Sequence, residues 1–285
     1  MATLEESFQY CRQVARNRAK NFYYSFVLLK HEQRDAMCAI YAFMRYCDDL
    51  SDEPGASRAA IERWRTALSD ALAGRAGDHP VWPGFIHTVE TYCIPHEYFH
   101  QMIDGVASDL EPRKIATFED LYRYCYHVAS VVGLTTIHIF GFHSEEAKPL
   151  AEKCGIAFQL TNILRDIKED AGLGRIYIPA EDLAKFGVTE EQLAAGDGNG
   201  VKDLLRFEAA RARRYYDESL PLLELVDKHS RPSLWALIEI YSRLLDRIER
   251  SDYDVFTRRI SLSTAQKSWI VARAASRAVG LGGYG

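Results

Sequence analysis

Two polar stripes, more than a hundred residues apart, constrain the fold of this 285-residue chain more than any other feature. The first stripe lies in residues 41–52, within an otherwise apolar stretch. At about 100° per residue, four of its side chains fall within roughly 60° of one another on a helix. These four are Tyr41, Arg45, Asp48 and Asp52. The first stripe therefore predicts a helix with a phenol, a guanidinium and two carboxylates on one face.

The second stripe lies in residues 159–170 and has the same helical period. Gln159, Asn162, Asp166 and Asp170 share an arc of about 80°. Two such helices facing each other would make a metal site lined by oxygen atoms. The competing interpretation is a solvated acidic face whose carboxylates pair with arginine or lysine.

Helical periodicity dominates the remaining sequence, and alternating β-branched runs are nearly absent, so we expect an all-α fold. No repeat or linker divides the chain, which predicts one domain over residues 1–285. The expected helices cover residues 5–18, 31–51, 58–73, 84–92, 96–108, 121–142, 149–172, 201–228 with a kink before Pro221, 232–251 and 264–279. An aromatic turn is expected at 21–26, and Pro54-Gly55 should end the second helix. Thr117 with Asp120 and Thr189 with Gln192 predict capped helix starts.

The net charge of −5 argues against a nucleic-acid partner, because such domains usually carry a basic excess. The acidic N-terminus lacks the apolar run of a signal peptide, and the most apolar window, 128–142, is too short and too interrupted to span a bilayer. We therefore expect a cytoplasmic protein, with peripheral association at a membrane as a further hypothesis. The six cysteines form no C-x-x-C pair and are expected to be buried thiols.

Carboxylates clustered in apolar helices repel one another unless cations neutralise them. Mg²⁺ suits the two stripes, because it prefers carboxylate, amide and water oxygens and is commonly shared with substrate phosphates. The sequence has no Gly-rich phosphate loop, which points to a diphosphate held through the metal ions and nearby arginines. The candidates for those arginines are Arg45, Arg165, Arg175 and Arg258.

Five motifs, in order, resemble those of the squalene and phytoene synthase family. They are residues 41–52, Tyr124-Cys-Tyr-His-Val-Ala-Ser-Val-Val-Gly133, 159–170, Arg175-Ile-Tyr-Ile-Pro179 and Tyr253-Asp-Val-Phe-Thr-Arg258. The resemblance runs from about Phe8 to Arg259. It implies an all-helical isoprenoid-synthase fold and head-to-head condensation of two allylic diphosphates through a cyclopropyl intermediate. It also implies Mg²⁺, or Mn²⁺ in its place, with NADPH used only if the product is squalene.

The resemblance assigns roles residue by residue. The metal ligands would be Asp48, Asp52, Asn162, Asp166 and Asp170, with Asp49 a weaker candidate. The diphosphate would be bound by Arg45, Arg165, Arg175, Tyr177, Tyr241 and Arg258, and Tyr41 would lie near the ionising carbon. The hydrocarbon pocket would hold Phe22, Phe26 and Tyr124. Val128, Val132 and Gln159 would also contact the substrate. An ordinary packing stripe is the alternative for Tyr124, Val128 and Val132.

Two departures from the family pattern affect the expected substrate. The chain has Arg16-Asn-Arg18 where many members carry a histidine, so Arg18 becomes a candidate phosphate ligand. With that early segment counted as the first motif and residues 41–52 as the second, residues 124–133 are the third motif. It ends in Ala-Ser-Val-Val-Gly, where many phytoene synthases have Ala-Gly-Thr-Val-Gly. Bulkier Ser130 and Val131 on a cavity wall would shorten the pocket, so the sequence favours two farnesyl diphosphates and a C30 product: squalene, dehydrosqualene or presqualene diphosphate. The alternative is phytoene synthesis from two geranylgeranyl diphosphates.

Three other interpretations complete the sequence-based picture. A non-catalytic assembly factor with the same fold would have no reason to keep buried, repelling carboxylates. A head-to-tail elongase or terpene cyclase shares the metal chemistry but lacks the Tyr-rich third motif and the Arg175 loop in this arrangement. The basic run at residues 211–214 is expected to be a solvated helix face.

Overall fold

The computed structural model describes residues 2–19, 21–52, 57–110 and 114–278, without the side chains of Asp52 and Ala278. In this part of the chain the secondary-structure elements are helices joined by loops. The helices are α1 (Leu4–Arg18), α2 (Phe22–Phe26), α3 (His31–Asp52), α4 (Arg58–Leu72), α5 (Trp82–Thr91), α6 (His96–Ser108), α7 (Phe118–Cys125), η1 (Tyr126–Ser130), α8 (Val131–Phe140), α9 (Ala147–Gly172), α10 (Ala180–Phe186), α11 (Glu190–Ala195), α12 (Val201–Ser219), α13 (Leu222–Leu225), α14 (Arg231–Arg250) and α15 (Thr264–Ala278).

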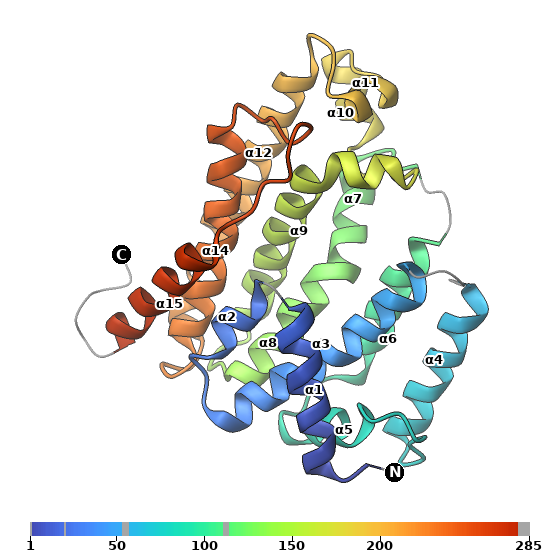
Figure 1. Ribbon diagram of the computed structural model, residues 1–285, viewed down its shortest axis with the longest axis vertical. Helices are drawn as coiled ribbons and strands as arrows, with labels where there is room; N and C mark the ends of the chain where they lie inside the picture. The colour runs from blue at the N-terminus through green and yellow to red at the C-terminus, as the bar shows by residue number, and fades with distance from the viewer. Residues whose placement is uncertain (1, 20, 53–56, 111–113, 279–285) are drawn as a thin grey trace.

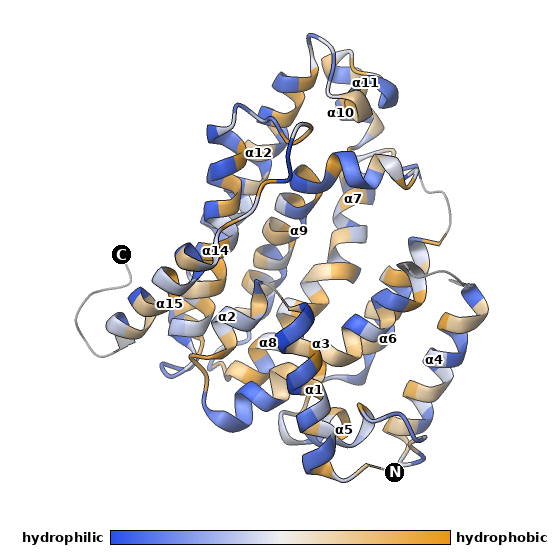
Figure 2. Ribbon diagram, in the orientation of Figure 1, coloured by the Kyte–Doolittle hydropathy of each residue, from blue (hydrophilic) through white to orange (hydrophobic). Residues whose placement is uncertain are grey.

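The helix α9 runs through the middle of the molecule (Figure 1). It packs against α12 and α14 on one side and against α7, η1 and α8 on the other. The helices α1, α4, α5 and α6 gather around α3, while α15 packs against α2 and α14. Most helices carry a hydrophobic stripe on one side and hydrophilic residues on the other (Figure 2). The buried stripes join into one continuous core.

Aromatic stacking fixes the position of α3 among its neighbours. The ring of Phe43 lies 4.5 Å from that of Phe85 and 5.7 Å from that of Trp64, measured between centroids. Phe43 and Phe85 are fully buried, and burial of each such ring contributes about 1.5–3 kcal/mol to folding. The Trp64 indole also donates to Cys47 Sγ at 3.1 Å. The acidic end of α3 therefore lies directly after a segment that a rigid aromatic cluster holds in place.

Gly155 lets the backbone of α9 pack directly against the backbone of η1. A Cβ added to Gly155 would lie 2.6 Å from Ser130 Cα and 2.8 Å from the Ala129 carbonyl oxygen. On the other side of the contact, a Cβ on Gly133 would lie 2.8 Å from the Ala151 carbonyl oxygen. Glycine at both positions brings the helix of the second stripe directly against the third motif.

The segment expected as one helix over 121–142 is divided in the structure. Residues Tyr126–Ser130 form a π-helical turn, and α8 continues from there to Phe140. A π turn takes up about one extra residue and is frequent at functional sites. It also shifts the phase of the helix, so the expected i, i+4, i+8 face of Tyr124, Val128 and Val132 is not that of a regular α-helix.

The other expected helices agree with the structure to within a few residues, and both capping boxes are present. The break before Pro221 separates α12 from α13, and the aromatic turn is the short helix α2. The helix α10 was not expected. The predicted stop at Pro54-Gly55 and the last expected helical residue, Val279, lie outside the described residues. All six cysteines are unpaired, and Cys93 alone among them is exposed. No helix in the described part of the chain combines the length and the apolarity needed to cross a bilayer.

Candidate active site

The first stripe lies along α3 as expected, with Tyr41, Arg45 and Asp48 half-buried on one face. Burial raises the pKa of the Tyr41 phenol to about 12, and Asp48 and Tyr241 act in the same direction while Arg45 and Arg18 oppose them. Tyr41 is thus a neutral phenol surrounded by charged groups. Asp52 belongs to α3, but its side chain lies outside the described residues.

Asp49 accepts hydrogen bonds from two arginines. Its Oδ1 accepts a hydrogen bond from Arg18 at 2.9 Å and another from Arg45 one turn earlier in α3. Arg45 Nε is buried and has no partner among the described residues. The free donor of Arg45 suits a bound anion such as a phosphate. Arg18, Arg45 and Asp49 line a pocket of about 470 Å³ between α1 and α3.

The second stripe lies on one face of α9, where Gln159, Asn162, Asp166 and Asp170 are half-buried and most residues between them are buried. Asn162 donates to Gln159 Oε1 at 3.4 Å, but Asn162 Oδ1 is buried and accepts no hydrogen bond from any described residue. An unpaired buried carbonyl oxygen is costly unless a donor or a cation occupies the space before it. This oxygen fits a metal ligand.

Asp166 is held by arginines from two directions. Arg165 Nε donates to Asp166 Oδ1 at 2.8 Å and its Nη2 to Oδ2, and Arg259 Nη2 donates to Oδ1 at 3.0 Å. Arg259 also pairs with Glu169 at 3.2 Å. Its neighbour Arg258, which the motif assigns to the diphosphate, is exposed. Arg259 is also exposed, at 55%, and it is the one of the two that reaches the second stripe in this structure. The assignment of Arg258 to the diphosphate stays a prediction.

Tyr241 of α14 links the two stripes. Burial raises the pKa of its phenol, with Arg165, Asn21 and Asn162 as opposing neighbours, and its ring stacks on Phe158 at 4.4 Å. Phe22 lies 5.7 Å from the same ring and is half-buried, as expected for a pocket wall. Phe26 is different: only 1% of it is exposed, so it packs in the core instead of lining a cavity.

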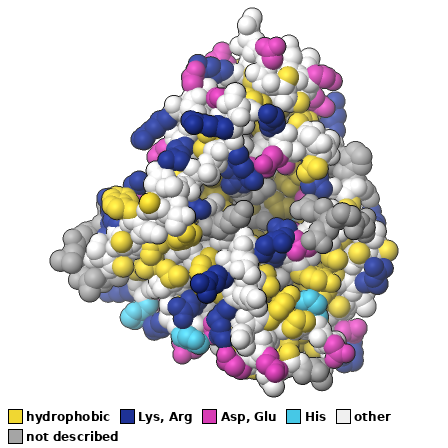
Figure 3. All heavy atoms as spheres, viewed as in Figure 1, with side chains coloured by type: hydrophobic (Ala, Val, Ile, Leu, Met, Phe, Trp, Pro, Cys, Tyr) yellow, Lys and Arg dark blue, Asp and Glu magenta, His cyan; other side chains and the backbone are white. Residues whose placement is uncertain are grey.

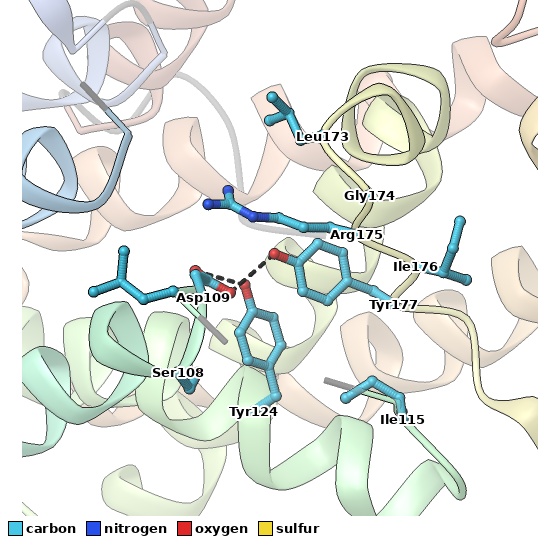
Figure 4. A pocket seen from close by; sticks show the side chains of 10 residues that line it. Ser108, Asp109, Ile115, Tyr124, Leu173, Gly174, Arg175, Ile176 and Tyr177 are labelled. Carbon is cyan, nitrogen blue, oxygen red and sulfur yellow. Dashed lines mark hydrogen bonds between the residues drawn. The ribbon is translucent and has the colours of Figure 1, made fainter. Parts of the chain in front are cut away.

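Asp109, at the end of α6, gathers two tyrosines from distant motifs (Figure 4). The Tyr177 hydroxyl donates to Asp109 Oδ1 at 2.9 Å and the Tyr124 hydroxyl to Oδ2 at 3.3 Å. The two rings stack with centroids 4.8 Å apart, and burial followed by the Asp109 charge raises the pKa of both phenols. Arg175 extends across the same pocket, which has a volume of about 230 Å³.

Asp170 shows the electrostatic character of this region. Burial raises the pKa of its carboxyl to about 7, and the nearby Asp166 and Asp109 add to the shift while Arg175 opposes it. Three acidic groups are thus near enough to influence one another. A bound cation would favour the ionised form of Asp170 and relieve this repulsion.

The third motif meets the cavity at some of the expected positions only. Val128 and Val132 are half-buried, and a Cβ on Gly105 would lie 2.8 Å from Val128 Cγ1. Ser130 and Val131, by contrast, have no exposed surface. Ser130 Oγ donates to the Glu152 carbonyl oxygen at 2.9 Å, so this residue faces α9 and not the cavity. Ser130 therefore does not narrow the pocket, contrary to the expectation from the sequence, and Val131 has no exposed surface with which to line it.

The donor set fits Mg²⁺ without showing a finished site. In the part of the chain that the structure describes, no three His, Cys, Asp or Glu side chains lie together as a cation cluster. The unpaired Asn162 oxygen and the raised pKa of Asp170 are what a hard cation with oxygen ligands would correct. Figure 3 shows a hollow near the middle of one face, with hydrophobic side chains on its floor and charged side chains at its edge.

Sequence reasoning missed Asp109, Arg259 and Arg211. Asp109 has no motif around it, and Arg259 directly follows a motif residue. Arg211, expected on a solvated face, has a side chain only 10% exposed and is bonded to Asp182 and Glu208. An arginine in an i, i+3 pair with Glu208 was the available signal, but the third partner, Asp182, is visible only in the fold.

Comparison with known proteins finds relatives along nearly the whole chain. The family model described as squalene/phytoene synthase matches residues 15–266. The chloroplastic phytoene synthase of Daucus carota is 37% identical, over 97% of this chain and 72% of its own length. The 15-cis-phytoene synthase of Synechococcus elongatus is 36% identical, over 94% and 92% of the two chains.

Two solved structures share the fold over nearly the whole chain. A crystal structure of a dehydrosqualene synthase with a bound ligand has a TM-score of 0.90 and 29% identity, over 97% of this chain and 98% of that chain. The squalene synthase HpnC from Alicyclobacillus acidocaldarius has a TM-score of 0.82 and 32% identity, over 88% and 95% of the two chains. The chain belongs to the squalene/phytoene synthase family and is a prenyltransferase of the head-to-head type.

Proposed function

We propose that this protein condenses two geranylgeranyl diphosphates head to head to phytoene. The observation that carries the proposal is the likeness to phytoene synthases at 36–37% identity along nearly the whole chain. Ser130 gives no reason to expect a shorter substrate, because its side chain faces α9, and Val131 is fully buried. Val128 and Val132 are half-buried, and in this proposal they contact the prenyl chain.

In this proposal Asp48, Asp52, Asn162, Asp166 and Asp170 hold Mg²⁺ or Mn²⁺ together with the substrate diphosphate. The metal ions would neutralise the negative charge that develops on the departing diphosphate. Arg45 contributes its unpaired buried Nε to the same anion. Arg175 and Tyr177 lie on the other wall, beside Asp170. Positive groups fixed before the substrate arrives stabilise a leaving group without reorganisation.

The carbocation that ionisation leaves needs a dry pocket with aromatic faces. Tyr41, Phe22 and the stacked pair of Tyr124 and Tyr177 provide such faces. The three tyrosine phenols stay neutral near pH 7, since burial raises the pKa of Tyr41, Tyr124 and Tyr177. Asp109 accepts from the hydroxyl groups of the stacked pair, so its role is to fix those two rings and not to ionise the substrate.

The test compares two substrates. The purified protein is incubated with Mg²⁺ and either geranylgeranyl or farnesyl diphosphate, with and without NADPH, and the extracted lipids are identified by mass spectrometry. We expect phytoene, formed without NADPH, and a higher kcat/KM for geranylgeranyl diphosphate. A C30 hydrocarbon as the main product would instead support the dehydrosqualene or squalene reaction, which the structural likeness at a TM-score of 0.90 favours. Failure to condense either substrate would refute the enzymatic proposal.

A further inference from the structure

Two arginines of α12 are embedded in carboxylate clusters on different sides of the helix. Arg211 Nη1 donates to Asp182 Oδ2 and to both oxygens of Glu208, each at 2.8 Å. The side chains of these three residues are 10%, 5% and 2% exposed. A buried cluster of this kind costs much desolvation, and replacing it by apolar side chains is often neutral for stability. Stability alone is therefore a weak reason for its presence.

The Arg211 cluster joins the two segments that carry Tyr177 and Tyr124. Asp182 lies in the first turn of α10, directly after the loop 175–179. The Arg211 guanidinium also lies 4.1 Å from the centroid of the Phe118 ring, at the start of α7. One side chain of α12 thus contacts the far end of the loop and the near end of the helix.

Backbone hydrogen bonds complete this junction. The Ala180 N–H donates to the Ile115 carbonyl oxygen at 2.9 Å, and the Glu181 N–H to that of Ala116 at 3.1 Å. In the opposite direction, the Phe118 N–H donates to Glu181 Oε1 at 2.7 Å. These bonds bind the segment before α7 to the segment after the loop, and Arg211 covers the junction from α12.

The junction bears on the distance between the Tyr177 and Tyr124 rings in the candidate active site. Tyr177 lies three residues before Ala180, and Tyr124 lies six residues after Phe118. Their rings stack at 4.8 Å and share Asp109, with Arg175 across the same pocket (Figure 4). A shift at the junction would move the loop against α7 and separate these groups.

We propose that Arg211 is a positioning residue: it fixes the loop 175–179 against the start of α7 and so sets the geometry in which Arg175 and Tyr177 meet the substrate diphosphate. This inference rests on the proposed function for the identity of that anion.

The same helix offers a matched control. Arg213 donates to Asp246, to Glu249 at 2.8 Å and to Ser242 at 3.0 Å, which ties α12 to α14. Arg211→Met and Arg213→Met each remove one arginine from a two-carboxylate cluster on α12. Both should lower the melting temperature, because each leaves carboxylates without their partner.

Only Arg211→Met should weaken diphosphate binding. We expect its Kd for inorganic diphosphate with Mg²⁺, measured by calorimetry, and its KM for geranylgeranyl diphosphate to rise about 10-fold, since misplacing groups by about 1 Å can cost up to ~100-fold. Arg213→Met should stay within about 2-fold for both constants, as interactions at independent sites act separately. Equal effects of the two variants, or an unchanged Kd in Arg211→Met, would overturn the proposal.

Arg211→Lys covers the case in which Arg211→Met does not fold. Lysine keeps the charge but lacks the planar group that reaches two carboxylates and stacks on Phe118. We expect a rise in the diphosphate Kd of about 3-fold with the fold retained; a wild-type Kd in this variant would count against a positioning role. The binding assay also separates the two proposals, because diphosphate affinity is measured even if the wild-type protein makes no phytoene.

Discussion

The substitution Gly155→Ala tests the close contact between α9 and η1. The added Cβ would lie 2.6 Å from Ser130 Cα and 2.8 Å from both the Ser130 nitrogen and the Ala129 oxygen. These are backbone atoms, so neither helix can yield by a side-chain rotation. Overpacking of this kind costs typically 1–3 kcal/mol, and the gain in helix propensity from glycine to alanine, about 1 kcal/mol, offsets only part of it.

We expect a net loss near 1–2 kcal/mol, because the overpacking cost is at the upper end of its range when backbone must move. For a chain of 285 residues that corresponds to a fall in melting temperature of about 2–4 °C. The separation of the helices would also move Asn162, two turns along α9, away from the third motif, so kcat should fall as well. Circular dichroism melts and the phytoene assay measure the two effects.

Gly172→Ala is the control in the same helix. A Cβ at this position meets no atom within 4 Å, so only the propensity gain remains and the melting temperature should stay level or rise. If Gly155→Ala melts at or above the wild-type temperature, the contact with η1 is not as tight as the structure has it, and the explanation for glycine at position 155 fails.

Three further predictions concern charged groups. Burial raises the pKa of Glu208 to about 8 from an ordinary value of 4.5. The free energy of unfolding of the wild-type protein should therefore fall as pH rises between these values, by up to about 1.4 kcal/mol per pH unit. Urea unfolding of Glu208→Gln should show a flatter dependence on pH, and a slope equal to that of the wild type would contradict the shift. Asp109→Ala removes the acceptor of two buried phenols and should cost about 2–4 kcal/mol in the same assay, whereas a loss below 1 kcal/mol would show that the phenols find other partners. Arg259→Gln should raise KM for the allylic diphosphate about 10-fold, because its partner Asp166 lies in the second stripe. Arg258→Gln should change KM less than about 2-fold, and the reverse order would support the motif-based choice of Arg258.

Local patterns in the sequence were sufficient for most helices and for the two stripes. The capping boxes at Thr117 and Thr189 involve side chains three residues apart, so they are readable without the fold. The same holds for the face of α9, because Asn162 and Asp166 depend only on the helical period. The division of 121–142 was not readable, since a π turn leaves no signature in residue type at Tyr126–Ser130.

The missed residues share one property: their partners are distant in the chain. Asp109 meets Tyr177, which is 68 residues away, and Arg259 meets Asp166 across 93 residues. Arg211 reaches Asp182 over 29 residues. The direction of the Ser130 side chain depended on which helix would pack against it. Chemistry within one helix could therefore be predicted, whereas contacts between helices required the fold.

The π turn has a consequence for how this segment can change in evolution. Deleting one residue from Tyr126–Ser130 would restore a regular α-helix and rotate everything beyond it by about 100°. Fully buried Thr135 and Ile137 would then leave the core face, and Gly133 would leave its contact with the Ala151 oxygen. A change of length in this segment therefore displaces more side chains than a substitution at any one position would. The spacing from Tyr124 to Gly133 should thus be kept in any relative that keeps the cavity, so an alignment gap between them would mark either an error or a different active site.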